Sequence, residues 1–506
     1  MTSGYVLPTP LDLSPLEDAL KGIYGLRVQA AARRTWTALE TFDGRIAEAG
    51  LELVHEDGRL VLSEADGREV ASAPHGRLPG RLLLADLPEG PLREALREVI
   101  DVRALTPVAR VSDRDRLLRV LDDQEKTVVR LHAEEPEVEG VGALSPRLRV
   151  ESVRGYDKAA ARVGAVLQEV LELVPVERSL WDEAVVLGGG APARGLPGVG
   201  IDLRPGVRAD RAAARICRRL LDVVELNLPG TLNDVDPEFL HDFRVAVRRT
   251  RALQRELRGV FPPEELEHWR AEFKWLQAVT GPSRDLDVYV LEFDDFRAAL
   301  PQARRADLAP LHDLLVRRRA AALRRMRRAL RSARTTQALR GWAEVLRALE
   351  DGTACGPDGH VPVGDLASVR ISKVYRQMVK AGREIHDGTP ADALHDLRKK
   401  GKELRYLLEF FASLYPKDVV KPMVSTLKAL QDTLGRFQDR EVQADLVGSL
   451  ADDIVGMDDG TTALMAMGLL VERLHTQQEE ARSEFAERFG RFAAKDQRAI
   501  VEETFR

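Results

Sequence analysis

LHDFRVAVRRTRAL at residues 240–253 returns as LHDLRKKGKELRYL at residues 394–407. Both stretches open on Leu-His-Asp, continue through a run of cations and close on leucine, and they lie 154 positions apart. The correspondence continues at the same offset and without a gap, because KWLQAVTGPSRDLDV (274–288) matches KALQDTLGRFQDREV (428–442). Several ordered segments at one offset indicate the internal duplication of a multi-helix unit.

The duplicated stretch is amphipathic when it is placed on a helix. Successive side chains of an α-helix are turned by about 100°, so the cations of the first copy fall within about 100° of one another. Apolar residues such as Phe243 and Leu253 fill the opposite side. The first stripe consists of His241, Arg244, Arg248, Arg251, Arg255 and Arg258, and the second stripe of His395, Arg398, Lys399, Lys402 and Arg405.

A cationic stripe opposite an apolar one is usually a solvated helix surface. Such a face normally mixes positive and negative side chains, whereas the first stripe contains no carboxylate, and the charge is kept in both copies. If the two repeats pack about a pseudo-twofold axis, their stripes meet in one groove, where the combined field of the cations gathers anions. We therefore predict a polyanion site shared by both repeats.

Glycine and proline divide the chain into domains. Residues 188–206, GGGAPARGLPGVGIDLRPG, are too rich in both for a helix and predict a linker. Residues 1–187 contain short alternating apolar runs, which predict an α+β domain. Residues 207–500 predict an all-α domain with helices of roughly 20 residues ended by Pro or Gly. Its first repeat is expected at 207–350 and its second at 367–500.

The expected elements of the N-terminal domain are strands and two helices. Residues 51–67, LELVHEDGRLVLSEADG, predict a hairpin that turns at EDG. Further strands are expected at 80–87, 116–132 and 147–153, and helices at 90–100 and 157–174.

The composition is that of a helix-rich soluble protein. Of the 506 residues, 44% are apolar and 31% charged, and no apolar run is long enough to span a bilayer. We see no signal-peptide pattern, so we expect a cytoplasmic protein without a membrane partner. The two cysteines, Cys217 and Cys355, form no CxxC pair and predict neither a disulfide framework nor a metal cage.

The net charge of −5 is unevenly distributed. Residues 1–200 hold 25 basic and 33 acidic side chains, whereas residues 201–340 hold 28 basic and 20 acidic ones. A basic segment within an acidic chain indicates a localised anion site.

The segments LHDFRVAVRRTRA, FKWLQAVTGPSRDLDV and LHDLRKKGKELRYLLEFF resemble the signature segments of the CHAD family, the conserved-histidine α-helical domain, over about residues 204–500. The resemblance implies two four-helix bundles related by a pseudo-twofold axis. It also implies binding of inorganic polyphosphate in a basic groove between them, association with polyphosphate granules, and no cofactor or metal. Gln438 stands at the position equivalent to Arg284, so the second repeat lacks that cation. The implied polyphosphate-binding residues are His241, Arg244, Arg248, Arg251, Lys274, Arg284, His395, Arg398, Lys399, Lys402, Arg405 and Lys428.

CHAD domains are commonly preceded by a CYTH domain, a tunnel-like β-barrel of the triphosphate tunnel enzymes, and the N-terminal domain resembles one. TFDGRIAEAGLELV (41–54) is similar to the family's early strand pair, and RVESVRGYDKAAARVGAVLQE (149–169) to its late strand and helix. Catalysis in that family needs an N-terminal ExExK motif, which does not occur here. We therefore expect a degenerate CYTH-like β-barrel without enzymatic activity.

Two other functions remain open. His-Asp dipeptides, at 241–242 and 395–396 among others, suggest a metal-dependent triphosphatase or phosphohydrolase, although the cations around each copy would repel a metal ion. RRRAAALRRMRRALRSAR (317–334) suggests nucleic-acid binding, although it carries no aromatic residues for stacking on bases and no known base-reading motif. We favour polyphosphate binding over both. The sequence leaves the oligomeric state open.

Overall fold

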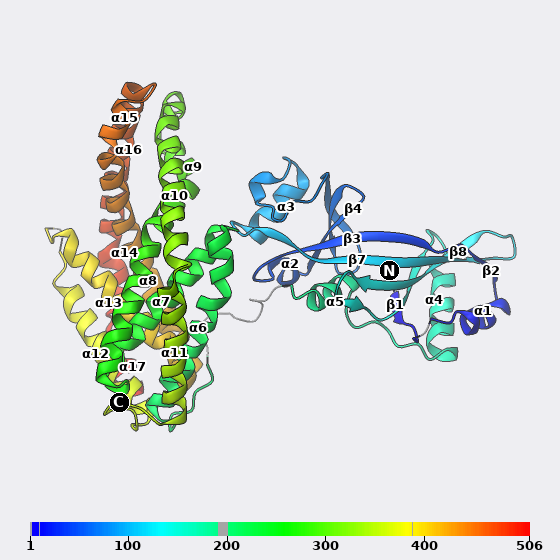
Figure 1. Ribbon diagram of the computed structural model, residues 1–506, viewed down its shortest axis with the longest axis horizontal. Helices are drawn as coiled ribbons and strands as arrows, with labels where there is room; N and C mark the ends of the chain where they lie inside the picture. Colours follow the sequence, from blue (N-terminus) through cyan, green and yellow to red (C-terminus); the bar gives the residue numbers. More distant parts are fainter. Residues whose placement is uncertain (1–2, 10, 191–200, 387, 506) are drawn as a thin grey trace. The chain divides into compact units, whose positions relative to one another are not determined.

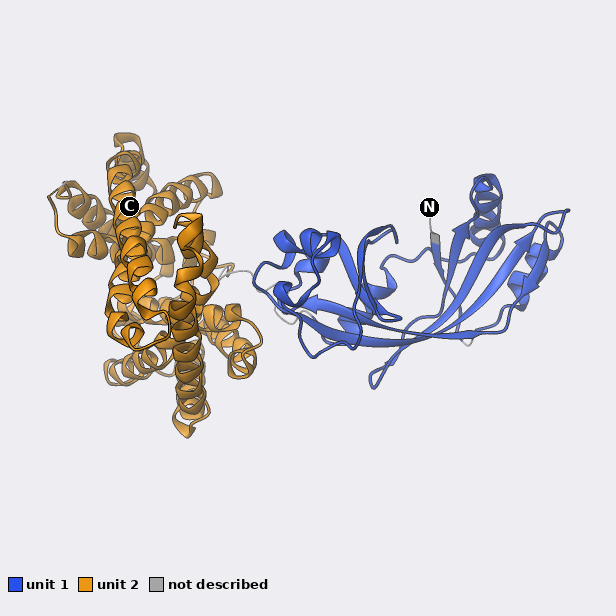
Figure 2. Ribbon diagram, turned by 90° about the horizontal axis from the view of Figure 1, so that it is seen from above, with its two compact units in different colours: residues 1–195 blue, residues 196–506 orange. Residues whose placement is uncertain are grey.

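The computed structural model divides the chain into two compact units, residues 1–195 and residues 196–506 (Figures 1 and 2). Part of the predicted linker, residues 191–200, lies outside the residues that the structure describes. Those described residues are 3–9, 11–190, 201–386 and 388–505.

The N-terminal unit is built on one antiparallel sheet (Figure 1). Its strand order is β1-β10-β8-β7-β3-β4-β5-β6, with β2 paired to β7 and β9 paired to β8. The strands are β1 (Ser3–Val6), β2 (Gly25–Val28), β3 (Ala32–Thr41), β4 (Leu51–Glu56), β5 (Arg59–Glu64), β6 (Glu69–Pro74), β7 (Leu105–Leu121), β8 (Thr127–Val138), β9 (Gly142–Ala143) and β10 (Arg147–Ser152).

The sheet is open, so the expected β-barrel is not formed. β1 and β6 end the strand order, and no pairing among the described residues joins them. The predicted hairpin is confirmed, because Asp57 and Gly58 join β4 to β5 with φ angles of 49° and 74°, as a tight two-residue turn requires. The predicted strand at 80–87 is wrong. Leu82 makes one isolated bridge to Leu105, and the chain then forms a 3₁₀ turn at Leu84–Asp86.

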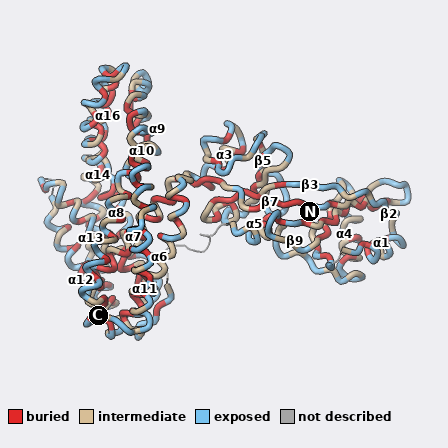
Figure 3. The backbone as a smooth tube through the Cα atoms, in the orientation of Figure 1, coloured by how far each residue is buried: buried red, intermediate tan, exposed pale blue. Residues whose placement is uncertain are grey.

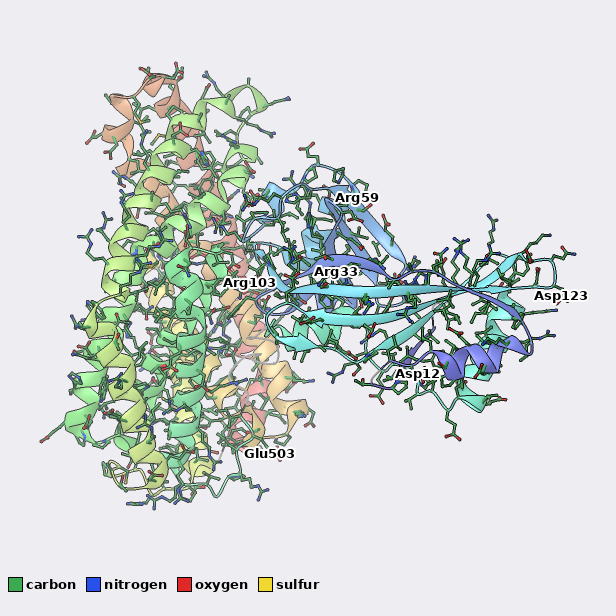
Figure 4. All side chains as sticks on the ribbon, turned by 45° about the vertical axis from the view of Figure 1, so that its right-hand side comes forward. Asp12, Arg33, Arg59, Arg103, Asp123 and Glu503 are labelled. Atoms are coloured by element: carbon green, nitrogen blue, oxygen red, sulfur yellow. The ribbon has the colours of Figure 1, made fainter. Side chains whose placement is uncertain are left out.

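Short helices pack on the sheet around two apolar clusters, one including Trp181 and the other Tyr5. The predicted helix at 90–100 is confirmed as α3, whereas the one at 157–174 ends earlier, in a π-helical turn at Val166–Val170. Arg103, labelled in Figure 4, is buried and pairs with Asp43 at 3.1 Å. The helices are α1 (Ser14–Lys21), α2 (Arg45–Glu48), α3 (Pro91–Ile100), α4 (Asp157–Ala165) and α5 (Leu180–Leu187).

The C-terminal unit is all-helical, as predicted. Its first three long helices begin at residues 209, 237 and 263, and α12, α13 and α14 begin 154 residues after them, so the duplication read in the sequence is present in the helix boundaries. The helices are α6 (Ala209–Asn233), α7 (Pro237–Glu256), α8 (Pro263–Leu291), α9 (Phe293–Ala298), α10 (Ala309–Leu330), α11 (Ala333–Asp351), α12 (Val363–Arg383), α13 (Ala391–Phe410), α14 (Lys417–Ser449), α15 (Ala451–Val455), α16 (Gly460–Phe492) and α17 (Lys495–Thr504).

One continuous apolar core runs through both repeats. It includes Phe243 and Leu276 of the first repeat and Leu397 and Phe437 of the second. Figure 3 shows the buried residues along the inner faces of the helices. The far ends of α8 and α14 pack with α9, α10, α15 and α16 around a second cluster. None of the described helices is long and apolar enough to cross a membrane.

Several helices are longer than the expected 20 residues. α8 has 29 residues and continues through Pro282, and α14 and α16 have 33 residues each. Proline removes one backbone hydrogen bond from a helix interior and usually ends or bends it. In α8 the packing of the helix on both sides of Pro282 outweighs that local cost, because Leu276 and Tyr289 are both buried.

Two helix glycines provide a matched test of core packing. A Cβ atom at Gly382 would lie 2.0 Å from the Phe489 ring, whereas one at Gly468 would meet nothing within 4 Å. We predict that Gly382→Ala lowers the free energy of unfolding by about 1–3 kcal/mol through overpacking. Gly468→Ala should raise it by about 0.5–1 kcal/mol through helix propensity. Urea unfolding followed by circular dichroism measures both, and equal effects of the two substitutions would contradict the packing described here.

Candidate functional site

A basic groove lies between α7, α8 and α13 and encloses about 440 Å³. Helices of both repeats line it, as the two stripes predict. Seven cationic side chains face two acidic ones, which leaves a formal excess of five positive charges. The cations are Arg248, Arg251, Arg255, Arg270, Lys274, Lys399 and Lys402, and the acids are Glu267 and Glu403.

Contacts between the repeats hold the two stripes against each other. Arg248 Nε of α7 donates a hydrogen bond to Tyr406 Oη of α13 at 2.8 Å. Arg255 pairs with Glu403 at 2.9 Å, again from α7 to α13. These contacts fix the spacing of the groove walls before any ligand binds.

Polar groups of α8 orient the arginines of the first stripe. Arg251 Nη1 donates to Gln277 Oε1 at 3.0 Å. Arg244 Nη1 donates to the Gln277 carbonyl at 2.8 Å and to Thr280 Oγ1 at 2.9 Å. Burial lowers the pKa of Arg244 and of Arg251. None of these acceptors carries a negative charge, so the positive charge of the two guanidinium groups is not neutralised by them.

Among the cations of the groove, Lys402 has the most strongly shifted pKa. Burial and the neighbouring Arg398 and Arg248 together lower its pKa to about 8. Both causes disfavour the charged amine, and a bound anion would reverse the second of them. The groove is therefore an electrostatically unfavourable place for cations until an anion enters it.

A buried amide also lines the groove. Gln254 is fully buried, and neither its Oε1 nor its Nε2 has a hydrogen-bond partner among the described residues. Because unpartnered buried polar groups are costly, such a group beside a cavity is typical of a site that accepts a polar ligand or water.

Of the twelve predicted site residues, Arg248, Arg251, Lys274, Lys399 and Lys402 line the groove. Arg244 and Arg398 are not among the lining residues, but each lies one helical turn before one of them, Arg248 and Lys402, and the two repeat one arrangement. Arg244 lies 3.6 Å from the position of a Cβ atom at Gly281, and Arg398 lies 3.5 Å from the same position at Gly435. Each arginine therefore occupies the space above a glycine, at the same offset in both repeats.

The predicted histidines do not line the groove and differ from each other. His395 Nδ1 hydrogen-bonds Gln438 Oε1. The ligand atoms of His241 lie within 4.8 Å of those of Glu238 and Asp242. Two carboxylates therefore lie close to His241, in addition to the cations that the sequence analysis expected around this copy of the motif. Each histidine lies on the same helix as its stripe, and His241 precedes Arg248 by about 10 Å along the axis of α7.

The remaining predicted residues lie outside the lining. Arg284 donates to the Pro237 carbonyl at 3.2 Å and lies 3.7 Å from Glu238. Arg405 pairs with Glu409 at 3.4 Å. Lys428 is exposed on α14. The structure does not bring these three side chains into the cavity.

The structure adds lining residues that the sequence analysis left out of the site: Arg255, Arg270, Glu267, Glu403 and Tyr406. Arg270 precedes Lys274 by four residues and so shares its helix face, a signal that the sequence contained. Glu403 and Tyr406 become part of the site only because α13 packs against α7.

A second charged cavity, of about 650 Å³, lies on the N-terminal unit. Arg34, Asp113, Glu134 and Arg149 reach it from four different strands. Most of that charge is paired, for example Arg149 with Glu134 at 2.9 Å. Burial and the nearby Glu134 raise the pKa of Asp113 to about 7. This cavity holds both acidic and basic side chains, whereas the groove has an excess of positive charge.

The family model of the CHAD domain matches residues 215–448. This match confirms the CHAD resemblance for the helical unit. It does not reach the N-terminal unit, for which a CYTH domain is not shown.

Two curated proteins of Mycobacterium tuberculosis, the uncharacterized proteins Rv2226 (strain H37Rv) and MT2285 (strain CDC 1551), are each 30% identical over 253 residues. The aligned part is 48% of this chain and 47% of each relative, so the chain spans about half of their length.

Two solved structures are similar to the chain. The crystal structure of the CHAD domain from the plant Ricinus communis gives a TM-score of 0.45 at 22% identity, covering 60% of this chain and 94% of that one. PptA from Streptomyces chartreusis gives a TM-score of 0.45 at 16% identity, covering 56% and 99%.

We predict that Lys402 titrates near pH 8 in the free protein. Reductive dimethylation with ¹³C labels every lysine, and one resonance should titrate with this midpoint and be missing from the Lys402→Arg variant. Because the folded-state pKa lies below the ordinary value, the charge on Lys402 opposes folding below pH 8, and this cost disappears as the pH rises above 8. Because the labelled α-amino group also titrates near pH 8, the prediction is contradicted if wild type and Lys402→Arg show the same resonances titrating in this range.

Proposed function

We propose that the helical unit binds inorganic polyphosphate in the basic groove. The observation that carries the proposal is that cations of both repeats line one cavity with an excess of five positive charges. The CHAD match over residues 215–448 supports it, because the resemblance to that family implies the same ligand.

The chemistry of the lining suits a chain of phosphates. Arginine guanidinium groups form forked hydrogen bonds with phosphate oxygens, and lysines such as Lys274 and Lys399 act as point charges that follow the ligand. Tyr406 is the one aromatic residue among the lining residues, and its hydroxyl group is bonded to Arg248. Proteins that bind single-stranded nucleic acids rely on stacking between the bases and aromatic side chains, so the groove favours a ligand without bases.

We further propose that the two repeats are related by a pseudo-twofold axis as two four-helix bundles. The repeated arrangement of Arg244 over Gly281 and Arg398 over Gly435 supports this. The aspartates four residues after each glycine support it too, since Arg398 pairs with Asp439 at 3.2 Å and the charge of Asp285 acts on Arg244.

For the N-terminal unit we propose a degenerate CYTH-like domain without enzymatic activity, because the ExExK motif is absent from the sequence. The resemblance to CHAD proteins also supports association with polyphosphate granules in the cytoplasm.

Binding should weaken steeply with salt. Each phosphate that is neutralised by the groove releases counterions, so the logarithm of the affinity should fall linearly with the logarithm of the salt concentration. Arg248→Gln combined with Lys402→Gln should reduce this slope. Arg340→Gln, at an exposed arginine on α11, is the matched control and should leave the slope unchanged. Equal slopes for both variants would place the binding surface elsewhere.

Long chains should bind much more tightly than triphosphate. A long chain contacts both walls of the groove, and its second contact is intramolecular and therefore occurs at high effective concentration. Substituting glutamine for Arg270 and Lys274 on α8, or for Lys399 on α13, should lower the affinity for long chains by about tenfold or more at unchanged stoichiometry.

Calorimetric titration of both ligands tests this prediction. Two independent sites would instead keep the original affinity at halved stoichiometry. Phosphate release in the same triphosphate samples, with Mg²⁺ present, should not exceed that of buffer. Turnover by the full chain would contradict the proposal of a non-catalytic N-terminal unit.

A further inference from the structure

The loop between the repeats is fastened to the beginning of α6. Within residues 352–362, the Val361 carbonyl accepts a hydrogen bond from Ala209 N at 2.9 Å, and the Gly359 carbonyl accepts one from Asp210 N at 3.0 Å. On its other side, Gly356 N donates to the Val260 carbonyl at 2.9 Å. The loop therefore has a defined backbone, fixed by bonds to two other parts of the helical unit.

This backbone brings together three side chains that commonly bind transition metals. The ligand atoms of Asp210, Cys355 and His360 all lie within 4.8 Å of one another. Asp210 is fully buried at the first turn of α6, Cys355 is half-buried and His360 is exposed. The group is thus anchored in the protein on one side and open to solvent on the other.

The distances suit a tetrahedral zinc ion. Zn–S and Zn–N bonds of roughly 2.3 and 2.05 Å at a tetrahedral angle place sulfur and nitrogen about 3.6 Å apart. Cys355 Sγ and His360 Nε2 lie 3.5 Å apart. Because a thiolate, an imidazole and a carboxylate are the ligand types that zinc takes in proteins, the donor set fits as well as the spacing.

A glycine makes this spacing available. A Cβ atom at Gly359 would lie 2.6 Å from Cys355 Cβ and 2.8 Å from its Sγ. Any larger residue at position 359 would push the cysteine out of its place. The close approach of backbone to sulfur keeps Cys355 directed toward Asp210 and His360.

We propose that Asp210, Cys355 and His360 form a zinc site that is separate from the basic groove. Both carboxylate oxygens of Asp210 now accept hydrogen bonds from Arg208, whose side chain is 34% exposed. Zinc would take one of these oxygens while the guanidinium group turns outward. Three protein ligands leave a fourth position for water. The bound ion joins the loop that leads into the second repeat to the first helix of the first repeat.

Cobalt titration of the full, reduced chain tests the site, because Co²⁺ bound to a thiolate gives a charge-transfer band in the near ultraviolet. Wild type should develop this band with one Co²⁺, and Zn²⁺ should abolish it. Cys355→Ser should lose the band. Cys217→Ala, at the buried second cysteine, is the matched control and should keep it.

His360→Ala should keep a band but bind Co²⁺ at least about tenfold more weakly. Zn²⁺ alone should raise the unfolding temperature of wild type and of Cys217→Ala, because it binds the folded state, but not that of Cys355→Ser. The absence of a band in wild type, a band that survives Cys355→Ser, or an unchanged affinity in His360→Ala would each overturn the proposal.

Discussion

The helical unit depends on the packing of α7 against α13, which forces cations of two repeats into one groove. The shift of the Lys402 pKa from 10.5 to about 8 corresponds to ~3 kcal/mol of disfavoured charge at this single side chain. Burial is the largest single cause of this cost, and the neighbouring Arg398 and Arg248 add to it. A hydrogen bond from Arg248 to Tyr406 and an ion pair from Arg255 to Glu403 hold the helices together despite it. An anion in the groove would offset the repulsion among these cations, as the proposed function requires.

The two repeats share the positions of their helices and of one arginine, but they differ in the contacts of their histidines. The arginines above Gly281 and Gly435 are equivalent. The histidines differ in their contacts, because the ligand atoms of His241 lie within 4.8 Å of those of Glu238 and Asp242, whereas His395 Nδ1 hydrogen-bonds Gln438 Oε1.

From the internal repeat and the helical periodicity, the sequence predicted where the helices of the second repeat begin and which cations form the two stripes. The offset of 154 residues anticipated the starts of α12, α13 and α14. The helical turn of 100° gave the two stripes, and the assumption that the repeats pack together placed Arg248 and Lys402 in one site. The sequence did not predict Glu403 or Tyr406, since their place depends on the contact between α7 and α13. Local rules also failed at Pro282, where tertiary packing extends a helix, and in the N-terminal unit, where only the pairing of strands reveals an open sheet. Cys355 and His360 likewise meet Asp210 through the path of a loop that spacing in the sequence does not encode.

If the groove binds polyphosphate as proposed, both repeats hold one phosphate chain. A crystal structure of the full chain with a polyphosphate of defined length decides this. We expect a single continuous phosphate chain in the groove, with oxygen atoms within hydrogen-bond distance of Arg251 on α7 and of Lys399 or Lys402 on α13. Phosphate bound on one repeat alone, or outside the groove, would contradict it.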